Sequence, residues 1–109
     1  TEENLKAAAA GEHEEWTSMY PEFAKVAREE GFTRIANLFE MVAKIEQEHD
    51  ARYNLLLANI QEDKVFKRNE KMIWMCSNCG HVYEGTEAPE ICPVCAHPKA
   101  FFEIKANNY

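Results

Sequence analysis

"CSNC" at residues 76–79 and "CPVC" at residues 92–95 decide how the C-terminal part of this chain folds. Two residues between the cysteines of each pair let one turn direct both thiolates at the same ion, and two such turns complete a tetrahedron around zinc or iron. A disulfide framework is the alternative, but the rest of the chain has no cysteine that could pair with these four. The pattern therefore predicts one metal site, in a reducing compartment such as the cytoplasm. Its ligands are Cys76, Cys79, Cys92 and Cys95.

The residues around these cysteines predict a small β domain. Short stretches of β-forming residues, at 73–75, 81–83 and 101–104, alternate with cysteine, glycine and proline. The preceding segment, residues 64–72, is mostly charged, and we interpret it as a linker or a frayed helix end. We therefore predict a domain over residues 73–109.

Residues 1–63 carry the spacing of two amphipathic helices. Apolar residues recur three and four positions apart, first over residues 5–27 and again over residues 35–60. Pro21 falls inside the first pattern and should kink that helix, and Gly31 supplies the left-handed residue at which helices end. A short link between two long amphipathic helices makes an antiparallel hairpin.

Four polar side chains interrupt the apolar faces of this hairpin. Glu12 and Glu15 lie three residues apart and so share one side of the first helix. Glu46 and His49 do the same on the second helix. In a hairpin that turns at residues 30–31, Glu12 comes level with His49, and Glu15 follows opposite Glu46. A lone carboxylate on an apolar face occurs by chance in an acidic chain. Three of them beside an imidazole carry a steep desolvation cost without a cation, so we predict a second metal site here.

The cysteine region resembles the rubredoxin family over residues 74–104. The resemblance rests on the pattern Cys-x-x-Cys-Gly-x-x-Tyr, followed by Ala-Pro, Cys-Pro-x-Cys and Lys-x-x-Phe. Those positions are Cys76, Cys79, Gly80, Tyr83, Ala88, Pro89, Cys92, Pro93, Cys95, Lys99 and Phe102. It implies one iron that cycles between Fe(II) and Fe(III), whereas zinc has no redox chemistry. The spacing alone also fits a zinc ribbon, so zinc stays open as a substitute.

Nearly the whole chain resembles the rubrerythrin family. The stretches that carry this resemblance are Asn4-Leu5-Lys6-Ala7-Ala8, Gly11-Glu12-x-x-Glu15, Met19-Tyr20-Pro21 and Glu30-Gly31-Phe32, together with Glu46-x-x-His49 and the cysteines. The implied fold class is α plus small β. A ferritin-like helical hairpin over residues 1–63 completes a four-helix bundle with a partner chain, and a rubredoxin-like four-cysteine domain follows. Family members place another hairpin before this one, and it is absent here. We therefore expect a second copy of this chain, or a separate N-terminal helical hairpin, to supply it.

The resemblance also implies a role for each residue of the hairpin site. Glu12 and His49 resemble terminal ligands, and Glu46 resembles a carboxylate that bridges two irons. Glu15 resembles an extra carboxylate that one iron binds or releases as its oxidation state changes. Tyr20 resembles a phenol that hydrogen-bonds a ligand carboxylate. We accordingly expect Glu15 and Tyr20 to take part in catalysis.

The activity that the resemblance implies is that of a non-haem iron peroxidase, which reduces hydrogen peroxide at a di-iron centre under oxidative stress. Electrons would arrive through the iron tetrathiolate site from a reductase or a rubredoxin. One alternative is an electron-transfer module whose hairpin serves only for dimerisation. Another is a zinc-ribbon regulatory protein, which the net charge of −7 disfavours because no basic face is available for nucleic acid. No apolar run approaches the about 20 residues that span a bilayer, so we expect no membrane partner.

Overall fold

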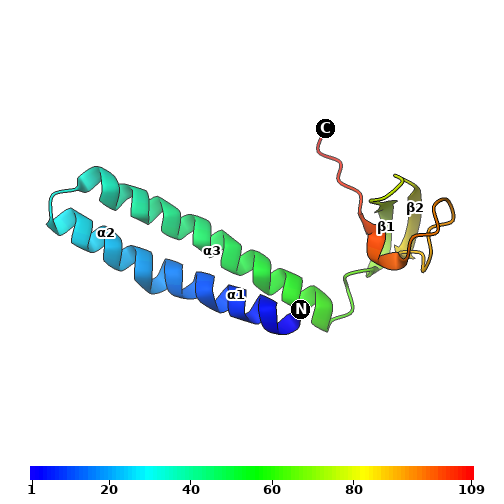
Figure 1. The fold of residues 1–109 in the computed structure, drawn as a ribbon, viewed down its shortest axis with the longest axis horizontal. Coiled ribbons are helices and arrows are strands. Elements are labelled where there is room, and N and C mark those ends of the chain that lie inside the picture. The colour runs from blue at the N-terminus through cyan, green and yellow to red at the C-terminus, as the bar shows by residue number, and fades with distance from the viewer. The chain divides into compact units, whose positions relative to one another are not determined.

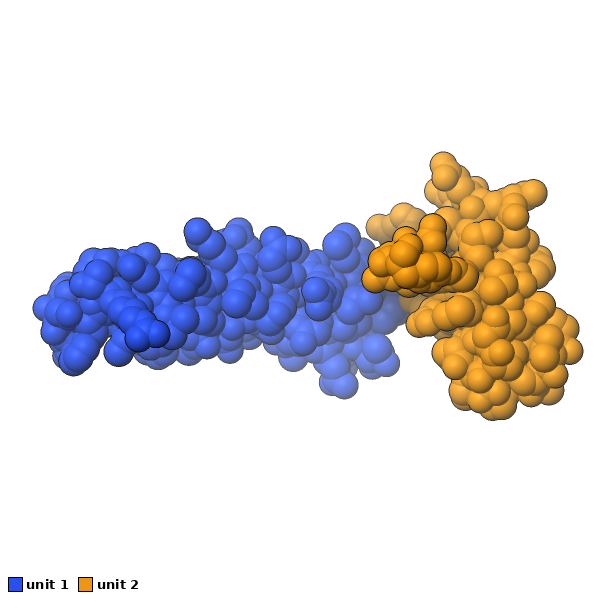
Figure 2. Space-filling model, turned by 90° about the horizontal axis from the view of Figure 1, so that it is seen from above, with its two compact units in different colours: residues 1–60 blue, residues 61–109 orange.

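The computed structural model describes all 109 residues and divides into two compact units (Figure 1). The first unit, Thr1–Ile60, is a helical hairpin, and the second, Gln61–Tyr109, is a small sheet domain. Figure 2 colours the first unit blue and the second orange. The elements are α1 (Glu2–Glu14), the π-helical turn η1 (Glu15–Met19), α2 (Tyr20–Glu29), α3 (Thr33–Gln61), β1 (Lys67–Cys76), β2 (Val82–Glu87), the 3-10 turn η2 (Lys99–Phe101) and β3 (Phe102–Ile104). The predicted fold class, a helical hairpin followed by a small β domain with four clustered cysteines, is confirmed. None of the helices combines the length and the apolar character needed to cross a membrane.

The hairpin turns at Gly31, as the sequence predicted. Gly31 has a φ of +86°, in the left-handed region that glycine adopts at little cost. Its N–H donates to the carbonyl of Arg28 at 3.1 Å, and the N–H of Phe32 donates to the carbonyl of Ala27 at 2.8 Å. These two bonds form the Schellman motif, which satisfies carbonyls that the end of α2 would leave free. The motif reverses the chain within three residues, and α3 begins at Thr33.

A π-helical turn interrupts the first helix, where the sequence predicted only a kink at Pro21. In this turn the N–H of Tyr20 donates to the carbonyl of Glu15, five residues earlier. Pro21 has no N–H with which to continue the α-helical pattern, and it stands at the start of α2. Single π-helical turns of this kind occur often at functional sites. Here the first residue of the turn is Glu15, one of the predicted site residues.

Small side chains make the fully buried part of the contact between the helices of the hairpin, while Tyr20 and Phe23 pack against Phe39 nearer the turn. Its buried residues are Ala9, Ala24, Ala27 and Ala36. Alanine buries little apolar area, so this contact contributes little hydrophobic stabilisation. The large apolar side chains stay on the surface, and several are at least 44% exposed: Phe23, Ile35, Leu38, Met41, Ile45, Leu55 and Leu56. The hairpin therefore lacks a core of its own, as expected for half of a helical bundle.

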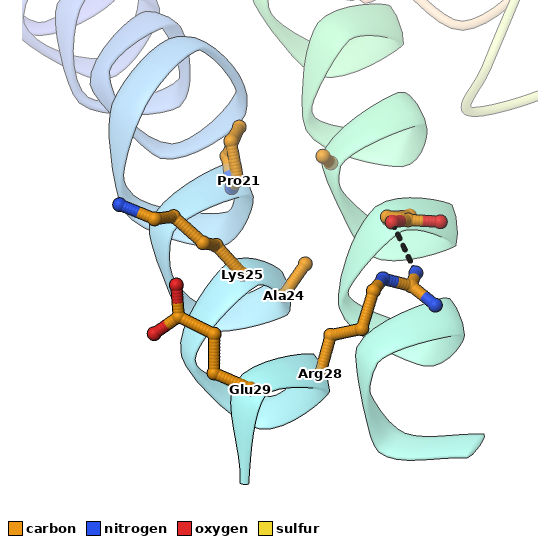
Figure 3. A pocket seen from close by; sticks show the side chains of 7 residues that line it. Pro21, Ala24, Lys25, Arg28 and Glu29 are labelled. Atoms are coloured by element: carbon orange, nitrogen blue, oxygen red, sulfur yellow. Dashed lines mark hydrogen bonds and ion pairs between the residues drawn. The ribbon is translucent and has the colours of Figure 1, made fainter. Parts of the chain in front are cut away.

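A cationic side chain ties the two helices together near the turn. Arg28 Nη2 donates to Asn37 Oδ1 at 3.1 Å and to Glu40 Oε1 at 2.5 Å. Figure 3 shows the Arg28–Glu40 pair beside a shallow groove between α2 and α3, with Ala24 in its lining. Exposed ion pairs contribute at most about 1 kcal/mol to stability, so these contacts of Arg28 add little to the stability of the hairpin.

The sheet of the second unit is built around Trp74. Its strand order is β2-β1-β3, with antiparallel neighbours, and all three stretches predicted as strands contribute to it. Trp74 on the central strand is fully buried, and its indole Nε1 donates to the carbonyl of Gly85 at 2.9 Å. The buried core comprises Trp74, Cys76, Ala88, Cys92 and Phe102. Two of these five core side chains are cysteines that the sequence assigns to the metal.

The segment that precedes the cysteines differs from the prediction. The sequence assigned residues 64–72 to a linker, yet β1 begins at Lys67, which pairs with Glu87 of β2. A register shift between Lys67 and Met72 separates this first pair from the main ladder. Residues 67–71 are exposed or half-buried and mostly charged, so they lack the apolar alternation that identifies a strand in a sequence. Pairing with β2 organises them instead.

Candidate metal centres

Two backbone turns of the same design present the four cysteines. In the first, the N–H of Cys76 donates to the carbonyl of His81 at 2.9 Å. In the second, the N–H of Cys92 donates to the carbonyl of His97 at 2.8 Å. Each bond closes a loop of the same length, so the chain repeats one local fold. This repetition is what the two Cys-x-x-Cys motifs predicted.

The residue that follows the second cysteine is also equivalent in the two turns. The N–H of Gly80 donates to the carbonyl of Cys76 at 2.8 Å, and the N–H of Ala96 donates to the carbonyl of Cys92 at 2.9 Å. Both residues are left-handed, with φ of +80° at Gly80 and +58° at Ala96. Glycine adopts this conformation freely, whereas alanine does so at a steric cost. The second turn is therefore the strained one.

The four sulfur atoms lie at the corners expected around one tetrahedral ion. Cys76 Sγ lies 3.7 Å from Cys95 Sγ, and Cys79 Sγ lies 3.6 Å from Cys92 Sγ. All four sulfurs are within 4.8 Å of one another, and all four thiols are free. Four metal–sulfur bonds of about 2.3 Å in tetrahedral geometry separate the sulfurs by about 3.8 Å, whereas a disulfide needs about 2.05 Å. The arrangement fits a metal and excludes a disulfide.

The protonation of the thiols also favours a cation at this point. The backbone N–H of His97 lowers the pKa of Cys95 to about 6, although burial opposes it. Cys79 receives the equivalent bond from the N–H of His81, but burial and the neighbouring thiols outweigh it and raise the pKa of Cys79 to about 12. Without a cation the four sulfurs cannot all be ionised, because thiolates at this spacing repel one another. A metal cation removes that conflict, since each ligand binds it as a thiolate.

A second group of donors lies in the hairpin. Glu12 of α1 and the Glu46–His49 pair of α3 place their ligand atoms within 4.8 Å of one another. His49 Nδ1 lies 2.7 Å from Glu46 Oε2 and 3.5 Å from Glu12 Oε1. Residues three apart share one side of a helix, so a single turn of α3 supplies two of the three donors. The structure thus brings Glu12 level with His49, as the hairpin register predicted.

Glu12 carries a buried oxygen that nothing in the chain satisfies. Its Oε2 is inaccessible to solvent and makes no hydrogen bond. Burial raises the pKa of Glu12, and the neighbouring carboxylate of Glu46 raises it further, whereas His49 lowers it. A cation among these donors would satisfy the free oxygen and favour the ionised carboxylate. Carboxylates and an imidazole are the donor set of ferritin-like di-iron sites, so the residues present fit iron.

Two further predicted site residues stand beside this group without joining it. Glu15 is half-buried and close enough for its charge to raise the pKa of Glu12, but it is not among the three converging donors. The ring of Tyr20 packs against Phe23 and Phe39, with ring centres 6.1 and 6.0 Å away. The catalytic roles of Glu15 and Tyr20 stay predictions.

A polar cluster that no sequence pattern indicated lies next to the donors. We call it the Asp50 cluster; its members are His13, Trp16, Asp50 and Asn54. Trp16 Nε1 donates to Asp50 Oδ2 at 2.9 Å, and His13 Nδ1 lies 3.0 Å from the same oxygen. Asn54 Nδ2 donates to Asp50 Oδ1 at 2.6 Å. The bond from Trp16, and then that from His13, lower the pKa of Asp50. The register that pairs Glu12 with His49 places His13 level with Glu48, two residues before Asp50, so counting positions along the hairpin did not point to the cluster.

Known families match the chain along almost its full length. The family model described as "Rubrerythrin" matches residues 1–73, and the model described as "Rubrerythrin, rubredoxin-like domain" matches residues 74–103. Rubrerythrin-1 of Clostridium acetobutylicum is 53% identical over all 109 residues, which cover 56% of that protein. The rubrerythrin of Porphyromonas gingivalis is 54% identical over the same 109 residues, which cover 54% of it. The chain spans about half the length of the curated relatives it matches.

A solved structure resembles the chain in the same way. The structure described as a partially reduced state of nigerythrin has a TM-score of 0.53 and 31% identity, and the match covers 95% of this chain and 49% of that one. The two family models follow each other along the sequence, and the donor groups of both regions are in place. This chain therefore belongs to the rubrerythrin family.

Proposed function

We propose that this chain forms part of a non-haem iron peroxidase, which reduces hydrogen peroxide at a di-iron centre with electrons that pass through the cysteine site. The observation that carries the proposal is the convergence of Glu12, Glu46 and His49 around a buried, unpartnered oxygen of Glu12. Membership of the rubrerythrin family supports the assignment. The hairpin offers only part of a ferritin-like donor set, so we propose the activity for an assembly that completes the site.

The donors of the hairpin are half of a ferritin-like set. Such a set takes one Glu from each of two helices and one Glu-x-x-His pair from each of the other two. This hairpin offers Glu12 and the Glu46–His49 pair. A second copy of the chain, related by a two-fold axis, or a separate N-terminal hairpin would supply the other half. Exposed residues such as Leu38 and Ile45 favour such a partner, since burying each large apolar side chain contributes about 1.5–3 kcal/mol.

The residues of this chain would hold the metals and respond to their charge. Iron, when bound, supplies two electrons to the O–O bond of the peroxide, and two protons complete its conversion to two water molecules. Glu46 would bridge two ions, while Glu12 and His49 would each hold one. Glu15, beside this group at the start of η1, would add a further carboxylate as positive charge increases. Tyr20 would donate its hydroxyl to a ligand carboxylate once the partner helices are in place.

The cysteine site would return the electrons. A tetrathiolate iron can accept and release one electron, whereas zinc at the same site would block this path. The N–H groups of His81 and His97 act on the sulfurs of Cys79 and Cys95, and bonds of this type tune the reduction potential. A reductase or a rubredoxin would be the upstream donor. The expected location in the cytoplasm stays a prediction, which the four free thiols support.

An electron-transfer module is the second candidate. The observation that favours it is that the cysteine site is complete within one chain, whereas the hairpin offers only three donors. In this case the hairpin would serve as a dimerisation element, and the four cysteines would hold all of the iron.

Iron stoichiometry and peroxide turnover separate the two candidates. We would load the chain with iron, determine the mass of the native assembly, and measure iron per chain together with hydrogen peroxide consumption. The peroxidase predicts iron beyond the single cysteine ion, and oxidation of the reduced cysteine iron when peroxide is added. Iron at the cysteines alone, with no peroxide turnover either by the chain or with a separate N-terminal hairpin added, would overturn the proposal in favour of the electron-transfer module.

A further inference from the structure

We infer that Asp50 is a positioning residue for the hairpin metal site, because its hydrogen bonds to the opposite helix hold Glu12 level with His49. The inference rests on the proposed function, since it assumes that the hairpin binds metal. It assigns a role to the Asp50 cluster, none of whose four members is a predicted ligand.

The geometry of the cluster suits this role. The Asp50 side chain is only 13% exposed, and its two oxygens together face three donors. Asn54 belongs to α3, as Asp50 does, whereas His13 lies on α1 and Trp16 on η1. The cluster therefore joins the two sides of the helical hairpin through one carboxylate, next to the metal donors.

The placement along the sequence couples the cluster to the ligands. His13 directly follows Glu12, Trp16 directly follows Glu15, and Asp50 directly follows His49. Adjacent residues on a helix point about 100° apart, so the cluster lies beside the donor face and does not occupy it. Any shift of one helix along the other would break the hydrogen bonds of the cluster and, at the same time, move the ligands apart.

Apolar packing alone would not set this register. The fully buried residues of the hairpin are alanines, the aromatic contacts of Tyr20 and Phe23 with Phe39 lie nearer the turn, and hydrophobic contact is not directional. A slip of one residue moves a helix by about 1.5 Å and turns it by about 100°, whereas metal ligands must stay within about 0.5 Å of their working positions. A hydrogen bond of 2.9 Å between Trp16 Nε1 and Asp50 Oδ2 fixes one register, because a slip would carry the two atoms out of reach.

Cobalt(II) binding to the full chain tests the inference. The thiolate-to-cobalt absorption of the cysteine site serves as an internal standard in each sample, and further cobalt reports the hairpin site. We expect Asp50→Ala to weaken hairpin cobalt binding by about 10–100-fold, as is typical when a residue that supports a ligand is lost. Trp16→Phe removes the N–H donor while keeping an aromatic ring, and it should weaken hairpin cobalt binding in the same direction. Asp50→Asn retains an acceptor for Trp16 and should recover part of the affinity.

A neighbouring acid provides the matched control. Glu48 is exposed on the same helix and makes no hydrogen bond, so Glu48→Ala removes an equal charge and should leave cobalt affinity unchanged. Circular dichroism measures helix content in every variant. Wild-type affinity in Asp50→Ala, or in a fully helical Trp16→Phe if Asp50→Ala unfolds, would overturn the inference. So would an affinity that falls only in proportion to lost helix. A wild-type chain that binds cobalt at the cysteines alone would instead overturn the proposed function on which the inference rests.

Discussion

The two units of this chain build their metal sites in opposite ways. The cysteine unit draws four donors from residues 76–95, and two equivalent backbone turns hold them. The hairpin draws three donors from two helices whose fully buried contacts are alanines, and it leaves Glu12 Oε2 without a partner. A site whose ligands are close in sequence can be complete in one short segment. A site whose ligands come from packed helices depends on everything that packs them.

The largest effect expected from this difference is the response to loss of the cysteine metal. Cys76→Ala removes a ligand that is also one of five core side chains, so we expect the sheet unit to unfold. Binding of a structural metal contributes about 10–16 kcal/mol in zinc-finger peptides, more than so small a core can replace. The fluorescence of buried Trp74 should shift to that of an exposed indole, while helix content is retained. A native Trp74 signal in the metal-free variant would show that the sheet folds without its ion.

The next effect is confined to the hairpin. Glu46→Ala should abolish metal binding there and leave the visible absorption of the cysteine site intact, because Glu46 is proposed to bridge two ions. The loss of metal affinity should be larger than the about 10–100-fold that is typical when a residue supporting a ligand is removed. Metal analysis and the absorption spectrum together provide the measurement, with Glu48→Ala as the control. Unchanged metal content would refute the bridging role, and loss of both signals would indicate that the chain had unfolded.

A smaller effect concerns the assembly that the hairpin needs. Leu38, Ile45 and Leu56 are about two and three turns apart on α3, so they form one exposed apolar stripe. Leu38→Lys should weaken association by about 10–100-fold, since burial of one such side chain contributes about 1.5–3 kcal/mol. Leu55→Lys is the matched control, because Leu55 is also exposed but points about 100° away from Leu56.

Sedimentation of the metal-free and iron-loaded chain measures this association. Iron should tighten it, because metal that binds only the assembled site stabilises the assembly by mass action. Equal association of wild type and Leu38→Lys would mean that the stripe is not the interface. Association that is indifferent to iron would mean that the partner does not complete the metal site.

The same division explains what the sequence could predict. The cysteine spacing and the turn of the hairpin at Gly31 are local signals, and motifs of a few residues predicted both correctly. That Glu12 lies level with His49 could be predicted by counting residues outward from the turn at residues 30–31, because a hairpin with a short turn has a fixed register. These features depend on chain geometry that neighbouring residues determine.

The features that the sequence did not reveal depend on contacts between distant segments. The strand at Lys67 exists because β2 pairs with it, and its charged residues carry no apolar alternation. At the π-helical turn, the N–H of Tyr20 bonds the carbonyl five residues back, that of Glu15, and not the one four residues back. In the sequence, Pro21 indicated a kink in the helix but not this change of hydrogen bonding. The left-handed conformation of Ala96 in the second cysteine turn could not be predicted from the sequence, because glycine is the residue that usually indicates such a position.

That alanine gives the smallest predicted effect, and it lies within the cysteine unit itself. Gly80 and Ala96 occupy equivalent positions, and a Cβ added at Gly80 would meet no atom within 4 Å. Backbone conformation is therefore the only cost of Gly80→Ala, which should destabilise the unit by about 1 kcal/mol. Ala96→Gly relieves the same strain but adds freedom to the unfolded chain, so it should stabilise the unit by about 0.5–1 kcal/mol. The double variant Gly80→Ala/Ala96→Gly moves the strain from one turn to the other and should match the wild type. Thermal unfolding followed by the thiolate absorption would measure all three, and a double variant much less stable than the wild type would show that the two turns are not equivalent.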